Sequence, residues 1–205
     1  MKILVLNSGS SSQKTCLYEI ADSVPDDPPA CLWEGNIEWE DDVAEVSIRN
    51  AKGVARNSRV KIASRAQAIG HLLGGLWNGD TRAVSTPSEI DVVGHRVVHG
   101  GPRYEDPVFI TPEVKSAIAK VSAFAPLHNR AELEGMEIVE KLLGPVPQIA
   151  VFDTGFHRRC RWLRRSIPVP TSGFRTAFTA MDFMASTINT APDVPRGCWA
   201  GIRMP

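Results

Sequence analysis

The sequence predicts an α/β protein with a mixed sheet and flanking helices. Three features predict this class: a strand–turn–strand unit opens the chain, residues 62–77 carry apolar side chains at helical spacing, and later apolar runs end in glycine or polar residues. With 205 residues, the chain is long enough to bury one or two hydrophobic cores.

The opening unit, residues 1–20, contains a polar turn that suits a phosphate group. Gly9 allows the backbone to approach a ligand closely, and the neighbouring serines offer N–H and hydroxyl donors to phosphate oxygens. These serines are Ser10, Ser11 and Ser12. Lys14 adds a positive charge, and Asn7 offers an amide oxygen to a hydrated Mg²⁺. The turn is not a Walker A loop, because it lacks that spacing and leads into a strand. A plain polar hairpin turn is the alternative.

The middle of the chain predicts a run of strands and then helices. Alternating apolar residues within 31–49 indicate further antiparallel strands, and residues 62–77 indicate a packed helix. A buried strand is expected over 91–98. Thr111 and Pro112 are typical of a helix start, and that helix is expected to reach about residue 125.

The last predicted elements bring a carboxylate to the end of a strand. A second helix is expected from about residue 130 to 143, where Gly144 and Pro145 end it. Residues 148–152 form the next strand, and Asp153 follows at its carboxyl end. Ligands collect at the carboxyl ends of strands in open α/β sheets, so Asp153 is a candidate site residue.

Four sequence blocks resemble the acetate kinase family of the actin/sugar-kinase/Hsp70 superfamily. They are residues 5–14, 90–101, 125–129 and 151–157, and they occur in the family's order. The resemblance implies that residues 1–157 form a ribonuclease-H-like N-terminal domain. Family members are about twice as long as this chain, so the resemblance also implies a truncated protein whose second domain is largely missing.

The resemblance also implies a role for each candidate residue. Asp153 is the catalytic proton donor or acceptor, and Arg96 is the guanidinium clamp on substrate oxygens. Val98 and Leu127 form the apolar acetate pocket. The serines of the turn and Lys14 bind ATP, while Asn7 serves Mg²⁺, with Mn²⁺ as a possible substitute. The residues alone leave open a strand-end ion pair for Arg96, a turn cap for Asp153, and core packing for the two apolar residues.

The implied reaction is ATP + acetate ⇌ acetyl phosphate + ADP, by direct in-line transfer. Two alternatives stay open: a catalytically inactive fragment of an acetate kinase, and a propionate or butyrate kinase relative. The family forms homodimers, an assembly that is doubtful for a truncated chain.

Residues 158–205 have a different character from the rest. They contain eight Arg, no Lys and only two acidic residues. The family block Tyr-Gly-Phe-His-Gly-x-x-His is absent, yet the codons of residues 181–189, read one base earlier, permit it. The codons of residues 170–174 likewise permit Pro-Tyr-Glu-Trp-Phe. We therefore predict that residues 158–205 are a frame-shifted, poorly ordered tail.

Composition excludes several other classes. Lys plus Arg and Asp plus Glu are balanced at 23 each, which gives no general case for nucleic acid or membrane partners. No apolar run approaches the roughly 18 residues of a membrane span, and the N-terminus does not resemble a signal peptide. The four cysteines lack metal-binding spacing and are expected to be reduced thiols of a cytoplasmic protein.

Overall fold

The computed structural model describes residues 1–21, 29–40, 42–104, 106–122 and 126–153, with the backbone alone for 126–128. The predicted tail at 158–205 therefore lies outside the described residues. No helix within these ranges combines the length and hydrophobicity that crossing a bilayer requires.

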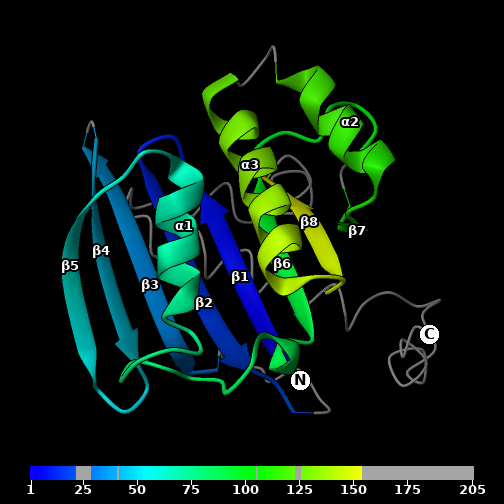
Figure 1. The fold of residues 1–205 in the computed structure, drawn as a ribbon. Helices are drawn as coiled ribbons and strands as arrows, with labels where there is room; N and C mark the ends of the chain where they lie inside the picture. The colour runs from blue at the N-terminus through cyan, green and yellow to red at the C-terminus, as the bar shows by residue number, and fades with distance from the viewer. Residues whose placement is uncertain (22–28, 41, 105, 123–125, 154–205) are drawn as a thin grey trace, which may run out of the picture.

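One mixed sheet organises the described residues, as the sequence predicts (Figure 1). Its eight strands lie in the order β5-β4-β3-β2-β1-β6-β8-β7. Strands β1 to β5 pair antiparallel, whereas β6 and β8 run parallel to β1, and β7 is an antiparallel edge strand. Their bounds are β1 Lys2–Ser8, β2 Ser12–Glu19, β3 Cys31–Glu40, β4 Val43–Asn50, β5 Ala55–Lys61, β6 Val92–Val97, β7 Val108–Phe109 and β8 Gln148–Phe152.

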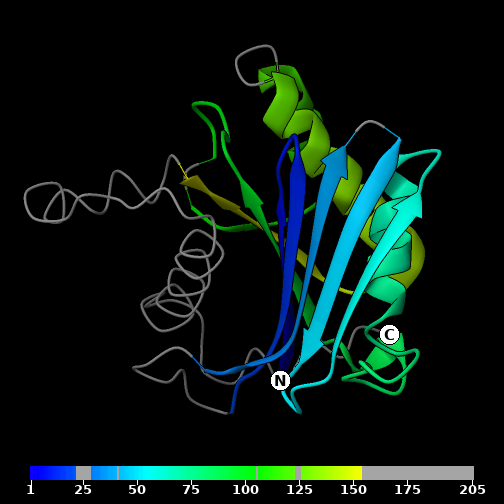
Figure 2. The ribbon, with the colours of Figure 1, turned by 90° about the vertical axis from the view of Figure 1, so that its left-hand side faces the viewer.

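Helices α1 (Arg65–Gly74) and α3 (Pro126–Leu143) lie on one face of the sheet (Figure 2). Helix α2 (Pro112–Val121) is capped by Thr111, whose hydroxyl oxygen accepts a hydrogen bond from the Val114 N–H. It packs against α3 and leads the chain from β6 back toward β8. Because β6 and β8 are parallel, this helical crossover brings their carboxyl ends to the same edge.

Apolar side chains fill both faces of the sheet. The largest cluster joins β1 to β4 and β6 to α1 and α3, and includes Leu6, Trp33, Leu72 and Val139. A second cluster lies between α2, α3, β6 and β8. A third gathers on the opposite face of β1, β2 and β6. Successive side chains of a strand point to opposite faces of the sheet, so the residues in these clusters show on which face their polar neighbours lie.

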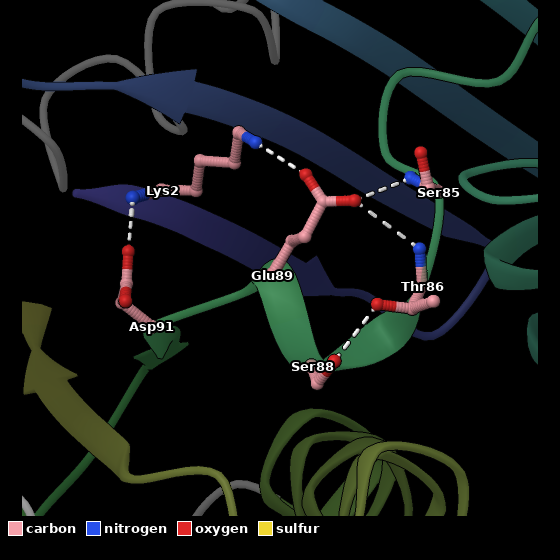
Figure 3. Close-up of polar contacts among 6 residues, drawn as sticks. All are labelled: Lys2, Ser85, Thr86, Ser88, Glu89 and Asp91. Carbon is pink, nitrogen blue, oxygen red and sulfur yellow. Dashed lines mark hydrogen bonds and ion pairs between the residues drawn. The ribbon is translucent and has the colours of Figure 1, made fainter.

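A polar network fastens the entry to β6 against the start of β1 (Figure 3). Glu89 lies in the short 3-10 helix η1, Pro87–Glu89, and its carboxylate accepts hydrogen bonds from Lys2 Nζ at 2.6 Å and from the backbone N–H groups of Ser85 and Thr86. These bonds lower the pKa of Glu89 to about 2. The Lys2 backbone N–H also donates to Asp91. The network holds the residues just before β6 against the first residue of β1.

The predicted elements need correction at several places. Strand β5 and the short strand β7 were not predicted: β5 carries mostly exposed polar side chains with no apolar alternation. The helix expected over 62–77 is limited to Arg65–Gly74, because Ser64 caps its first turn and residues 75–77 form a turn. The last helix begins at Pro126 rather than near 130, and the one before it ends at Val121.

Candidate active site

Three predicted site residues meet at the carboxyl ends of adjacent parallel strands. Asn7 is near the end of β1, Arg96 is near the end of β6, and Asp153 follows β8. Leu6, Val97 and Phe152 belong to the clusters packed on the helices, so the residues next to them point to the opposite face. Asn7, Arg96 and Asp153 therefore share the sheet face that α1 and α3 leave uncovered.

The guanidinium of Arg96 joins the other two side chains. Its Nε and Nη2 donate to the two carboxylate oxygens of Asp153 at 3.0 and 2.5 Å, and its Nη1 donates to Asn7 Oδ1 at 3.0 Å. The Arg96 and Asp153 side chains are 22% and 27% exposed. A partly buried fork–fork pair holds the planar guanidinium in a defined orientation. The sequence left open an ordinary ion pair for Arg96, and the partner proves to be the other candidate residue.

The polar turn between β1 and β2 is braced by Arg65, a residue that the sequence did not single out. The Arg65 guanidinium donates to the carbonyl oxygens of Gly9 and Ser10, both at 2.7 Å. It also lies 4.0 Å from the ring centroid of Trp39 and pairs with Glu134 on α3. Carbonyl oxygens held by a cation are turned away from any anionic ligand, so the bracing suits a loop that presents N–H groups.

Lys14 lies on β2 directly opposite Asn7 and on the same face of the sheet. It lines a groove of about 570 Å³ that continues over β3, β4 and β5 past Asn36, Glu38 and Arg49. Arg96 and Asp153 do not line this groove. Lys14 thus lies where this groove meets the cluster of Asn7, Arg96 and Asp153. Ser10 and Ser11 are exposed at the turn, and Ser12 is half-buried.

Two further buried polar residues, Asn129 and Glu132, project from α3 toward the chain that follows β6. Asn129 Nδ2 donates to the His99 carbonyl at 3.2 Å, and Glu132 Oε1 accepts from the Val98 N–H at 3.0 Å. Burial is the main cause that raises the pKa of Glu132, to about 8. Sequence reasoning missed Glu132, because an acidic residue in a helix usually faces solvent.

Of the two predicted pocket residues, the structure describes one side chain. Val98 is half-buried just beyond β6, and its N–H is held by Glu132. Leu127 lies in the first turn of α3, and its side chain is outside the described residues. Their closeness in space therefore stays a prediction.

The oxygens at the strand ends fit an incomplete magnesium site. The described residues contain no cluster of three or more His, Cys, Asp or Glu side chains able to hold a metal. They do offer the Asn7 amide oxygen and the Asp153 carboxylate, joined through Arg96. Mg²⁺ in nucleotide sites commonly takes one or two protein oxygens and completes its shell with phosphate and water. This donor set fits a metal that arrives with a nucleotide.

Comparisons with known proteins point to one family. The model of the acetokinase family matches residues 2–171. The acetate kinase of Cyanothece sp. (strain PCC 7425 / ATCC 29141) is 55% identical over 159 residues, which cover 77% of this chain and 39% of that protein.

Two solved structures show the same fold. A crystal structure of Porphyromonas gingivalis acetate kinase has a TM-score of 0.69 and 31% identity, and the match covers 86% of this chain and 43% of that one. A propionate kinase from Francisella tularensis subsp. tularensis SCHU S4 has a TM-score of 0.64 and 29% identity over 83% of this chain and 41% of that one. The chain thus spans about two fifths of the length of these relatives.

Proposed function

Because this chain belongs to the acetokinase family, we propose that it supplies the acetate-binding part of an acetate kinase. That enzyme transfers the γ-phosphate of ATP to acetate and gives acetyl phosphate and ADP. The observation that carries the proposal is the Asn7–Arg96–Asp153 cluster at three adjacent strand ends, within the region that matches the family.

The proposed mechanism follows from the charges of this cluster. Acetate and the γ-phosphate are both anionic, so their approach needs a cation, and Arg96 provides one in a fixed plane. An arriving carboxylate competes with Asp153 for the guanidinium, which places Asp153 beside the acetate oxygen. There Asp153 can hold or release a proton at that oxygen. Positioning and charge neutralisation account for most of the rate.

The turn between β1 and β2 is the proposed phosphate-binding loop. Arg65 holds the carbonyls of Gly9 and Ser10, and the serines and Lys14 supply donors and positive charge toward the ATP phosphates. Asn7 would hold Mg²⁺ or Mn²⁺ together with the nucleotide. When bound, the metal supplies charge neutralisation at the phosphate oxygens.

A second candidate is an inactive remnant that binds anions weakly. It is favoured by the chain's coverage of only about two fifths of its relatives and by the aberrant residues 158–205. The curated match of 159 residues is close to the predicted break after residue 157, although the family model continues to residue 171. Within the enzyme class, the propionate kinase neighbour keeps a longer acyl substrate open.

Location and assembly are further parts of the proposal. The described cysteines, Cys16 and Cys31, are free thiols, which suits a reducing compartment such as the cytoplasm. A homodimer is the assembly that the family resemblance implies. Light scattering on the purified chain would test it by giving the molar mass directly.

An acyl phosphate assay with the purified 205-residue chain tests the proposed activity. Hydroxylamine traps acetyl phosphate formed from ATP and acetate, with propionate and butyrate in parallel reactions. ATP-dependent product above the level of an Asp153→Asn variant supports an active acetate kinase. No product above that level, with correctly folded protein, supports the inactive remnant.

A further inference from the structure

The carboxyl group of Glu132 is buried beside the site but has no role in the mechanism above. The residue is 2% exposed, and its Oε1 accepts the Val98 N–H at 3.0 Å. Its second oxygen, Oε2, is buried and has no hydrogen-bond partner within the described residues. A buried oxygen without a donor is a poor place for a negative charge. The geometry favours the neutral acid.

The charged groups that act on Glu132 come from two strands of the site. Arg96 on β6 attracts a charge there, and Asp153 after β8 opposes it. Burial outweighs both and raises the pKa of Glu132 to about 8, so the group is mainly protonated at neutral pH. An ionised Glu132 would place a second negative charge near the Arg96–Asp153 pair.

We propose that Glu132 is a positioning residue whose neutral carboxyl group fixes the backbone at Val98 and leaves the guanidinium of Arg96 to Asp153. The proposal rests on the proposed function, because it assigns Glu132 to the acetate-binding end of that site. One oxygen ties α3 to the end of β6. The other carries the proton and adds no negative charge that could draw Arg96 away.

Carbon-detected NMR on the full 205-residue chain tests the proposal, because it does not depend on exchangeable protons. We compare the wild type with Glu132→Gln, which stays neutral and keeps an oxygen for the Val98 N–H. Glu137→Gln, an exposed position on the same helix, is the matched control. The Asp153 Cγ and Arg96 Cζ resonances are followed from pH 5.5 to 9.5.

The wild type and the control should show a step in both resonances with a midpoint near pH 8. In Glu132→Gln the step should be absent, and the resonances should match those of the wild type at low pH. A wild-type Glu132 Cδ that titrates below pH 6, or a step that persists in Glu132→Gln, overturns the proposal. A variant that disturbs Asp153 and Arg96 at low pH also overturns it.

Binding of ¹³C-labelled acetate separates this proposal from the function on which it rests. Wild-type affinity should fall above pH 8, whereas the affinity of Glu132→Gln should stay constant. Equal pH dependence in the two proteins counts against the role of Glu132. If neither protein binds acetate at any pH, the proposed function fails, and the carbon titration still decides whether Glu132 positions Arg96.

Discussion

At the scale of single residues, neighbouring positions on β6 have opposite electrostatic environments. Arg96 faces the open side of the sheet, whereas His95 faces the helices and is 2% exposed. His95 Nε2 lies 2.7 Å from Gln148 Oε1, which requires a proton on that nitrogen for a hydrogen bond. Burial lowers the pKa of His95 to about 4 despite the opposing effect of Gln148. One strand therefore holds a charged side chain on one face and a neutral imidazole on the other.

His95 should make the fold sensitive to acid. Its pKa is lower in the folded state than the usual 6.5, so the unfolded chain binds more protons between these values, and stability falls as the pH drops from 6.5 to 4. At pH 5 the loss relative to pH 7 should be about 2 kcal/mol. Urea unfolding of His95→Gln should lack this loss, whereas the exposed His71→Gln should retain it. If the free energy of unfolding changed with pH equally in both variants, His95 would not be the source of the acid sensitivity.

Glu132 gives the opposite pH dependence, which is why paired variants are needed. Its pKa is raised in the folded state, so its contribution to stability falls as the pH rises from 4.5 to 8. The contribution of Glu132 to the pH dependence of stability is the same in His95→Gln and His71→Gln, because both proteins retain Glu132, so it cancels when the two are compared.

The planar fork of Arg96 should matter beyond its charge. Arg96→Lys keeps the positive charge but loses the planar array of donors that reaches both oxygens of Asp153 and Asn7 Oδ1. We expect acetate affinity, measured by NMR of ¹³C-labelled acetate, to fall by about tenfold or more, since a bidentate charge-assisted contact is lost. Arg59→Lys on β5, where the side chain is 64% exposed, should bind acetate as the wild type does. If Arg96→Lys bound acetate as tightly as the wild type, the planar guanidinium of Arg96 would have no special role in binding acetate.

At the scale of elements, the packing of α1 on the sheet depends on a strand position without a side chain. A Cβ added at Gly35 on β3 would lie 2.5 Å from the Trp33 ring and 2.7 Å from Leu72 Cδ1 of α1. Trp33 and Leu72 are fully buried, so neither can move into solvent. Helix α1 reaches the sheet closely because Gly35 leaves this space.

Gly35→Ala should therefore destabilise the protein by about 1–3 kcal/mol, the usual cost of overpacking a core. Gly70→Ala, in the middle of α1, is the matched control: an added Cβ there meets nothing within 4 Å. That change should stabilise the helix by up to about 1 kcal/mol, because alanine favours helix. Chemical denaturation measures both. A Gly35→Ala protein as stable as the wild type would show that α1 moves easily on the sheet.

The sequence predicts elements well where burial leaves a pattern. The strand at Gln148–Phe152 and the hairpin of β1 and β2 are confirmed, because their apolar runs end in turn residues. Strand β5 has no such pattern, since it is an edge strand with its side chains largely in solvent, and β4 supplies its hydrogen bonds. The early start of α3 at Pro126 was missed because the block 125–129 has no helical apolar period.

At the scale of the whole molecule, topology explains why distant residues form one site. Asn7, Arg96 and Asp153 are far apart in sequence, but parallel pairing of β1, β6 and β8 brings their strand ends together. Strand prediction and the family blocks were sufficient to expect this cluster. Bracing by Arg65 and burial of Glu132 depend on how α1 and α3 dock, which residue patterns do not specify.

The reading frame is a prediction about the entire protein. If residues 158–205 are frame-shifted, correcting one base across codons 155–162 should restore Pro-Tyr-Glu-Trp-Phe and Tyr-Gly-Phe-His-Gly in that order. The corrected protein should form acetyl phosphate at least about 10²-fold faster than the 205-residue chain, because the block after residue 157 supplies further electrostatic stabilisation. Sequencing from codon 150 onward and the hydroxylamine assay check the two parts separately. Unaltered DNA together with a corrected protein that stays inactive would reject the frameshift and leave these residues as a genuine, divergent tail.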